Sequence, residues 1–414
     1  MRALALVDTD SYVKWGAALL AQLPADWDRR VAVVATPGAP SAGQLSAALA
    51  GSGFEGTSRA LTLDTLGARI AEEKPDVVIV AMRGPAASVV LRVLSELPDR
   101  PVLVSGLPGI SIPATWKALF YRAQADLMVL HSKREIREFE LVAGKRGWTH
   151  RLALATLPFI DRSKAAGGSD VVFAVQSIVP LERAHRERVL DILIETARRN
   201  PQNRVVIKVR ALPGEQQTHD EEYSYPDLLA ARTAPPSNLV VAAGAMSTAL
   251  DSAAGLVTVS STASIEAIAR DIPLIMLDEF GVSDELINPV FVGSGLFGDG
   301  EAVASLAFAR PNPEWLDDNY FHPDGDVDWT RSLDDLLGQR ASAPLAARPS
   351  LRGHIGGVLR RAWERKQAFG RHDRTVLGGL ALAVGTPARS AVLLGRRLRG
   401  RRVHVWDSPA PPRG

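Results

Sequence analysis

Short apolar runs alternate with longer amphipathic stretches through the first three quarters of the chain. Runs that are apolar without alternation predict strands buried on both faces, as in a parallel sheet that helices cover. In the first part of the chain we expect such strands over 4–7, 31–35, 76–81, 101–105 and 125–131, with helices between them. This succession predicts a doubly wound α/β domain.

The same pattern restarts after the small, polar stretch Lys164–Ser169, which indicates a linker. We therefore predict two doubly wound Rossmann-like domains, over residues 1–164 and 165–325. An irregular, basic helical extension is predicted over 326–414. Two such α/β halves imply a cleft, with ligands bound at the C-terminal ends of the strands.

Composition and charge narrow the class of protein. The chain has no cysteine, which excludes disulfides and thiolate chemistry. Its start lacks the long apolar segment of a signal peptide, so we expect a cytoplasmic protein. Residues 348–414 hold 15 Lys and Arg against 3 Asp and Glu, so the net charge of +2 combines a tail of +12 with a body of −10. The acidic body argues against nucleic acid as the ligand.

The basic tail suits an anionic membrane surface, so we expect a peripheral position on the inner face of the plasma membrane. An uncharged run over 375–388 is too short to cross a bilayer without burying Arg389. It favours a helix at the interface. Packing on the body and a spanning segment remain alternatives.

The most informative motif follows the predicted strand 255–259. Ser260, Ser261 and Thr262 come directly after it, and a helix then begins with Glu266 in its first turn. Unpaired N–H groups at a helix start, together with adjacent hydroxyls, suit a phosphate group. A carboxylate nearby suits ribose hydroxyls. The alternative is a turn whose polar residues only cap the helix.

A second group of polar residues follows the predicted strand 204–209. It consists of Lys208, Arg210, Glu215 and His219, at the same edge of the sheet as the serines. Arginine binds phosphate through two parallel charge-assisted hydrogen bonds. A solvated, charged loop is the alternative, and for His219 the alternative is an ordinary surface histidine.

The N-terminal half offers acceptor-side candidates at its strand ends. Asp10 is a candidate general base, with Asp8 assigned to capping the following helix. His131, at the end of another strand, is a competing base. Gly84, Gly106 and Gly109 follow strands in the same manner, and glycine lets a backbone approach a sugar or phosphate closely.

Residues 170–300 resemble the C-terminal domain of GT-B glycosyltransferases, in particular bacterial capsule-polysaccharide transferases of the sialyl and Kdo type. In that family a Ser-Ser/Thr…Glu…Gly-x-Pro stretch holds the donor nucleotide, and here Asp271 replaces the glycine. The family's Lys-Pro-His-Pro-x-Glu loop corresponds to Lys208–Glu215, where the histidine is absent and Arg210 stands near its place. The Glu279–Val282 and Gly293–Phe297 elements resemble a related actinobacterial group.

The resemblance implies a metal-independent glycosyltransferase. It would move a sugar from a nucleotide-activated donor to a glycan or lipid-linked acceptor in cell-surface polysaccharide synthesis, with no cofactor besides the nucleotide-sugar substrate. Lys208, Arg210 and the serine hydroxyls would neutralise the leaving phosphate. The missing histidine leaves the donor base open. Two alternatives remain: a nucleotide-sugar epimerase of the same architecture, and a non-catalytic glycan- or nucleotide-binding protein.

Overall fold

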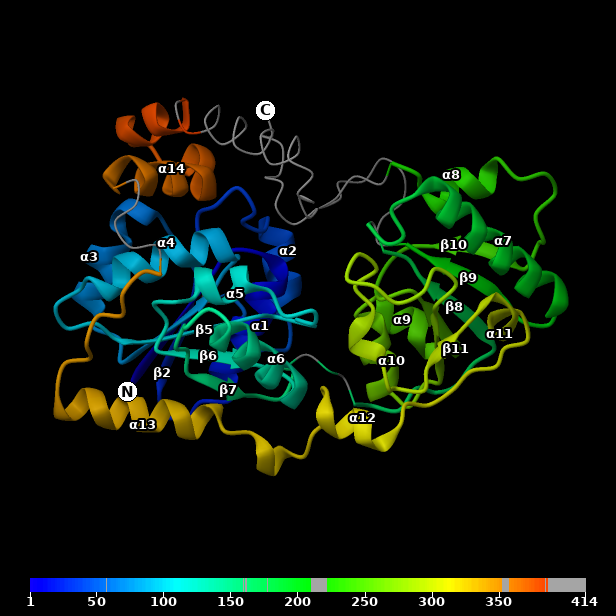
Figure 1. Ribbon diagram of the computed structural model, residues 1–414, viewed down its shortest axis with the longest axis horizontal. Coiled ribbons are helices and arrows are strands. Elements are labelled where there is room, and N and C mark those ends of the chain that lie inside the picture. The colour runs from blue at the N-terminus through cyan, green and yellow to red at the C-terminus, as the bar shows by residue number, and fades with distance from the viewer. Residues whose placement is uncertain are drawn as a thin grey trace. The chain divides into compact units, whose positions relative to one another are not determined.

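The computed structural model describes residues 1–56, 58–158, 160, 162–176, 178–209, 222–351, 357–383 and 385. The chain divides into two compact units and forms two sheets that helices accompany (Figure 1). The first unit comprises Met1–Pro108, Lys117–Met128 and Thr330–Gly414, and the second comprises Gly109–Trp116 and Val129–Trp329. The division into domains at residues 164 and 325 stays a prediction.

The first sheet has seven strands in the order β3-β2-β1-β4-β5-β6-β7. They are β1 (Arg2–Val7), β2 (Asp28–Val34), β3 (Arg59–Leu61), β4 (Val77–Ala81), β5 (Val102–Gly106), β6 (Leu127–Leu130) and β7 (Leu152–Leu154). The pairs from β3 to β5 are parallel. The accompanying helices are α1 (Asp10–Ala21), α2 (Ala42–Leu49), α3 (Leu63–Glu73), α4 (Gly84–Ser95), α5 (Trp116–Tyr121) and α6 (Lys133–Gly144).

The second sheet has six strands in the order β10-β9-β8-β11-β12-β13, and all of its pairs are parallel. The strands are β8 (Asp170–Ala174), β9 (Val205–Lys208), β10 (Leu239–Ala242), β11 (Ala253–Thr258), β12 (Leu274–Leu277) and β13 (Phe297–Gly298). The helices are α7 (Arg183–Arg199), α8 (Tyr225–Ala230), α9 (Met246–Asp251), α10 (Ala263–Ala269), α11 (Gly300–Ala304) and α12 (Pro313–Asp318), with 3-10 turns η1 (Pro289–Phe291) and η2 (Asp324–Asp326).

Strand β8 shows why the apolar runs do not alternate with polar residues. Val171 and Phe173 pack into one hydrophobic cluster, while Val172 and Ala174 pack into another. Because successive side chains of a strand point to opposite faces, both faces of this sheet are covered. The predicted fold class, two doubly wound α/β sheets, is confirmed.

Both sheets place their first strand beside their fourth: β1 pairs with β4, and β8 pairs with β11. The chain therefore reverses its direction of winding at these pairs. In open α/β sheets such a topological switch point, at the C-terminal ends of the strands, is where ligands bind. We call them the first and the second switch point.

The C-terminal part of the first unit adds α13 (Trp329–Ser342), α14 (Gly357–Phe369), η3 (Gly370–His372) and a helix over 376–383. Within the predicted basic extension, α14 packs against α4. Arg340 of α13 donates hydrogen bonds to the carboxylate of Asp76 at 3.2 Å and to the carbonyl of Arg100 at 3.0 Å. No helix in the described ranges combines the length and the apolar character needed to cross a bilayer.

Candidate functional site

An ion pair between a buried aspartate and a half-exposed arginine joins the strand ends at the first switch point. Asp8 follows β1, and its carboxylate accepts hydrogen bonds from the backbone N–H of Arg83 at 3.1 Å and from Arg83 Nε at 3.3 Å. Arg83 follows β4, and 48% of its side chain is exposed, whereas that of Asp8 is fully buried. Desolvation raises the pKa of Asp8, although the charge and the hydrogen bonds of Arg83 oppose it.

A second arginine joins the neighbouring strand ends. Arg122 is buried, and its guanidinium donates to the carbonyl of Gly106 at 2.8 Å, to the carbonyl of Met82 at 3.1 Å and to the hydroxyl of Tyr12 at 2.7 Å. Met82 follows β4, Gly106 ends β5, and Tyr12 lies in the first turn of α1. One side chain therefore fixes the C-terminal ends of two strands relative to a helix.

Asp8 and Asp10 have different partners in the structure. Asp10 begins α1, is half-exposed and forms an ion pair with Lys14 at 3.3 Å. Thr9, not Asp8, occupies the N-cap position, and Asp8 bonds to Arg83 instead of capping the helix. The difference arises because the switch point brings the end of β4 to Asp8, which the local sequence does not reveal.

The three candidate glycines have different surroundings. Gly84 begins α4, and a Cβ atom there would lie 2.4 Å from the ring of Tyr121, so close packing requires glycine. The carbonyl of Gly106 is a partner of Arg122. Gly109 has open space where a Cβ atom would stand. Of Gly84 and Gly109, only the latter offers room for close approach of a ligand.

His131 belongs to a buried polar cluster of the second unit. Its side chain is fully buried, with Nδ1 3.1 Å from the carbonyl oxygen of Ala155. Its backbone N–H donates to Glu135 Oε2 at 2.9 Å. The other oxygen of Glu135 accepts from the N–H of Ser111 and from the hydroxyl of Tyr320, both at 2.8 Å. Burial raises the pKa of Glu135 to about 6.

At the second switch point the predicted donor residue Ser260 bonds to Gln176, which the sequence does not single out. Gln176 follows β8, and its Oε1 accepts from the N–H of Ser260 at 3.1 Å and from the hydroxyl of Ser260 at 2.8 Å. The backbone carbonyl of Gln176 accepts from Arg186 at 3.0 Å. Arg186 lies on α7, is buried and also donates to the carbonyl of Pro180 at 2.8 Å.

Lys208 extends this edge toward β10. It ends β9, is buried, and its ammonium donates to the carbonyls of Val209 at 2.8 Å and Gly244 at 2.7 Å. Desolvation lowers the pKa of Lys208. Since β9 lies beside β8, Lys208 and Gln176 stand at neighbouring strand ends. Arg210, Glu215 and His219 lie outside the described residues.

The turn that holds Ser260, Ser261 and Thr262 satisfies several of its N–H groups by hydrogen bonds within itself. Ser261 is buried; its N–H donates to Thr258 Oγ1, and its own hydroxyl accepts from the N–H of Ala263. Its carbonyl accepts from the N–H of Ser264. These N–H groups therefore already have partners within the turn. Thr262 is exposed and Glu266 is half-buried.

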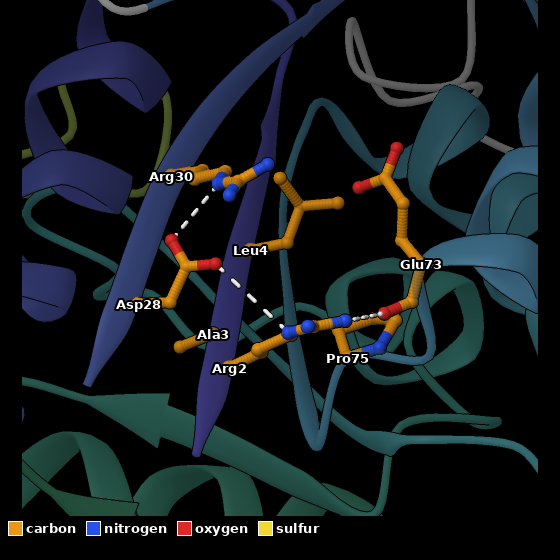
Figure 2. Close-up of a pocket in the computed structure, with 7 residues that line it drawn as sticks. All are labelled: Arg2, Ala3, Leu4, Asp28, Arg30, Glu73 and Pro75. Atoms are coloured by element: carbon orange, nitrogen blue, oxygen red, sulfur yellow. Dashed lines mark hydrogen bonds and ion pairs between the residues drawn. The ribbon is translucent and has the colours of Figure 1, made fainter.

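Two hollows lie away from both switch points. One, of about 170 Å³, is at the start of β1 and β2, where Asp28 forms ion pairs with Arg30 and Arg2 (Figure 2). Another, of about 900 Å³, lies between α6, residues 292–293 and α12 in the second unit. Over the described part of the chain, no group of three or more His, Asp or Glu side chains is placed to hold a metal ion.

The fold is that of GT-B nucleotide-sugar enzymes, as solved structures indicate. A Listeria monocytogenes "putative UDP-N-acetylglucosamine 2-epimerase" has a TM-score of 0.53 at 11% identity, over 84% of this chain and 92% of that one. Another UDP-N-acetylglucosamine 2-epimerase has a TM-score of 0.53 at 14% identity, over 83% and 97%. The Neisseria meningitidis UDP-GlcNAc 2-epimerase bound to UDP-GlcNAc has a TM-score of 0.50 at 11% identity, over 83% and 100%.

Residues 3–336 match the family described as "Putative glycosyltransferase (DUF6716)", and the chain belongs to this family. No protein of curated function matches the sequence. The solved structures are below 15% identity and indicate similarity of fold.

Proposed function

We propose that this protein transfers a sugar from a nucleotide-activated donor to a hydroxyl of a glycan or lipid-linked acceptor. The observation that carries the proposal is the Gln176–Ser260 pair at the second switch point, where open α/β sheets bind ligands. Membership of a glycosyltransferase family supports the reaction class. The resemblance to capsule-polysaccharide transferases supports cell-surface polysaccharide synthesis as its setting.

In this proposal the donor lies along the C-terminal edge of the second sheet. Gln176 holds Ser260 in place, and the exposed Thr262 faces the nucleotide together with Glu266. Lys208 fixes the backbone at Gly244. Arg210, Glu215 and His219 supply further contacts to phosphate and base. As the glycosidic bond breaks, these donors and charges stabilise the leaving phosphate, and the proposal needs no metal ion and no further cofactor.

The acceptor proton goes to Asp10 in this proposal. Asp10 has a half-exposed carboxylate, whereas His131 has no exposed surface. A general base must come within hydrogen-bond reach of the hydroxyl that it deprotonates, so the exposed group is the better candidate. The enzyme would work in the cytoplasm, with the basic tail drawn to the anionic inner face of the plasma membrane.

Binding of nucleotides tests the donor site. We expect one of CMP, CDP, UDP and GDP, or a sugar derivative, to bind the full chain in isothermal titration calorimetry. Gln176→Ala removes the acceptor that orients Ser260, so it should weaken that binding about tenfold, or about 1.4 kcal/mol. Asn203→Ala is the matched control. Asn203 donates to the carbonyl of Ser169 at the opposite edge of the same sheet, and its loss should leave the affinity unchanged.

The outcomes separate the alternatives. If no nucleotide of the panel binds, or if Gln176→Ala binds as tightly as the wild type, the proposed donor site is wrong. Turnover of the nucleotide-sugar without any acceptor would indicate an epimerase. Binding that is never followed by turnover with glycan or lipid-linked acceptors would indicate a non-catalytic binding protein.

A further inference from the structure

Exposed apolar side chains gather in the C-terminal part of the first unit. Twelve large apolar side chains are exposed on the described part of the chain, and five of them fall between residues 358 and 380. They are Val358, Leu359, Val376, Leu377 and Leu380. Scattered exposed apolar residues are ordinary, but a concentration of them indicates a surface that binds a protein or a membrane.

The helix over 376–383 carries the most exposed of these side chains. Val376 is 80% exposed and Leu380 is 61% exposed. Because they are four residues apart, they lie on the same side of the helix. Gly378 and Ala381 are buried on another side, and a Cβ atom at Gly378 would lie 2.6 Å from the carboxylate of Asp373. The helix is therefore seated on the protein with its larger apolar residues facing outward.

This helix is attached to the folded body through α14. Phe369, at the end of α14, is buried in a hydrophobic cluster with strands of the first sheet. The buried carboxylate of Asp373 accepts hydrogen bonds from Arg365 Nε at 3.2 Å and from the N–H of Thr375 at 3.1 Å. Figure 1 shows α14, in orange, and the following helix, in red, on the outer side of α4. These contacts hold the helix that carries the apolar face against the first unit.

Two exposed arginines lie just before the apolar helix in the sequence. Arg371 and Arg374 lie five and two residues before Val376, and both are exposed. Together with desolvation, which is the larger cause, their charge lowers the pKa of the intervening His372. The sequence from 386 to 414 adds seven arginines and one aspartate. Apolar residues flanked by arginines are the composition of segments that lie in the interface of an anionic bilayer.

We infer that this face docks on an anionic lipid bilayer. Val376, Leu377 and Leu380 would enter the boundary between headgroups and acyl chains, while Arg371 and Arg374 meet the lipid phosphates. A bilayer surface satisfies both groups at once, because apolar insertion and charge attraction act at the same plane. The basic tail would add electrostatic attraction, whereas the apolar face would insert into the bilayer. Neither depends on the nucleotide site.

Vesicle binding tests the inference. We expect the full chain to cosediment with phosphatidylcholine vesicles that contain about one third phosphatidylglycerol, and to bind pure phosphatidylcholine more weakly. The double substitution Val376→Ser, Leu380→Gln should lower the partition coefficient about tenfold or more, because it removes several inserted methylene groups. Leu141→Gln is the matched control: Leu141 is 60% exposed, on α6 of the second unit, and its replacement should leave partitioning unchanged.

Four results would overturn the inference. They are no cosedimentation of the wild type, no difference between the two vesicle compositions, equal partitioning of the double variant, and loss of binding only in Arg371→Gln, Arg374→Gln. If the double variant instead turned a dimer into a monomer in light scattering, the face would be a contact between copies. Titration of nucleotide into the same samples keeps the two proposals separate. If the protein binds nucleotide but not vesicles, the docking face alone is wrong. If it binds vesicles but not nucleotide, the donor site alone is wrong.

Discussion

Replacing Arg122 by methionine is expected to lower the free energy of unfolding by about 3–5 kcal/mol. Methionine keeps much of the side-chain length but removes the donors that bind the carbonyls of Gly106 and Met82 and the hydroxyl of Tyr12. Buried acceptors that lose their donors bear the full cost of desolvation. The buried carboxylate of Asp8 also loses a positive charge that lowers its pKa.

Urea denaturation of the wild type and the variant measures this loss. Arg69→Met is the matched control, because Arg69 is largely exposed and forms an ion pair with Glu72 at 3.3 Å within the same helix. Exposed pairs of this kind contribute about 0–1 kcal/mol, so the control should unfold close to the wild type. If Arg122→Met and Arg69→Met shifted the denaturation midpoint equally, the network around Arg122 would have no special role in stability.

The central strands of the sheets could be predicted because strands buried on both faces are apolar at every position. A strand such as β8, whose neighbours cover both sides, contains apolar residues without alternation. The short edge strand β3 (Arg59–Leu61) was not predicted, because three residues with Arg59 at their start carry no such mark. Apolar patterning thus identifies central strands, while an edge strand depends on the chain that it pairs with.

The candidate donor site was predictable only in part. The sequence predicts Ser260 and Lys208 as site residues because hydroxyl and cationic residues directly after strands are typical of phosphate sites. Gln176 was missed, although it follows β8 as Ser260 follows β11. The strand order β10-β9-β8-β11 places the first strand of this sheet beside its fourth and so brings Gln176 to Ser260. The side-chain amide of Gln176 carries no charge, so the local sequence does not mark it as a binding residue. Its contact with Ser260 depends on the pairing of β8 with β11.

Glu135 shows a second limit of local patterns. Ser132 and Glu135 have the spacing of a capping box, in which the two side chains bond within one helix start. Ser132 does cap α6, by accepting from the N–H of Glu135. The carboxylate of Glu135, however, also binds Ser111 and Tyr320, which lie 24 and 185 residues away. Spacing along the chain indicates the local bond, and only the tertiary fold provides the distant ones.

The buried carboxyl of Glu135 should make stability depend on pH. Desolvation outweighs the hydrogen bonds to the carboxylate and raises the pKa of Glu135 from 4.5 to about 6. The folded protein therefore binds the proton more tightly than the unfolded chain does. The resulting stabilisation is fully present below pH 4.5 and is lost as the pH rises through about 6. The difference between the two pKa values corresponds to about 2 kcal/mol.

Glu135→Gln isolates this contribution, because the amide is neutral at every pH. The free energy of unfolding of the wild type minus that of the variant should fall by about 2 kcal/mol between about pH 4 and pH 7. Glu138→Gln is the matched control on the same helix; its carboxylate is 43% exposed and lies 3.9 Å from Arg134. That control difference should change by less than about 0.5 kcal/mol. If the curves of the wild type and Glu135→Gln ran parallel, Glu135 would titrate alike in the folded and unfolded chains, and the hydrogen bonds from Ser111, His131 and Tyr320 would fully offset its burial.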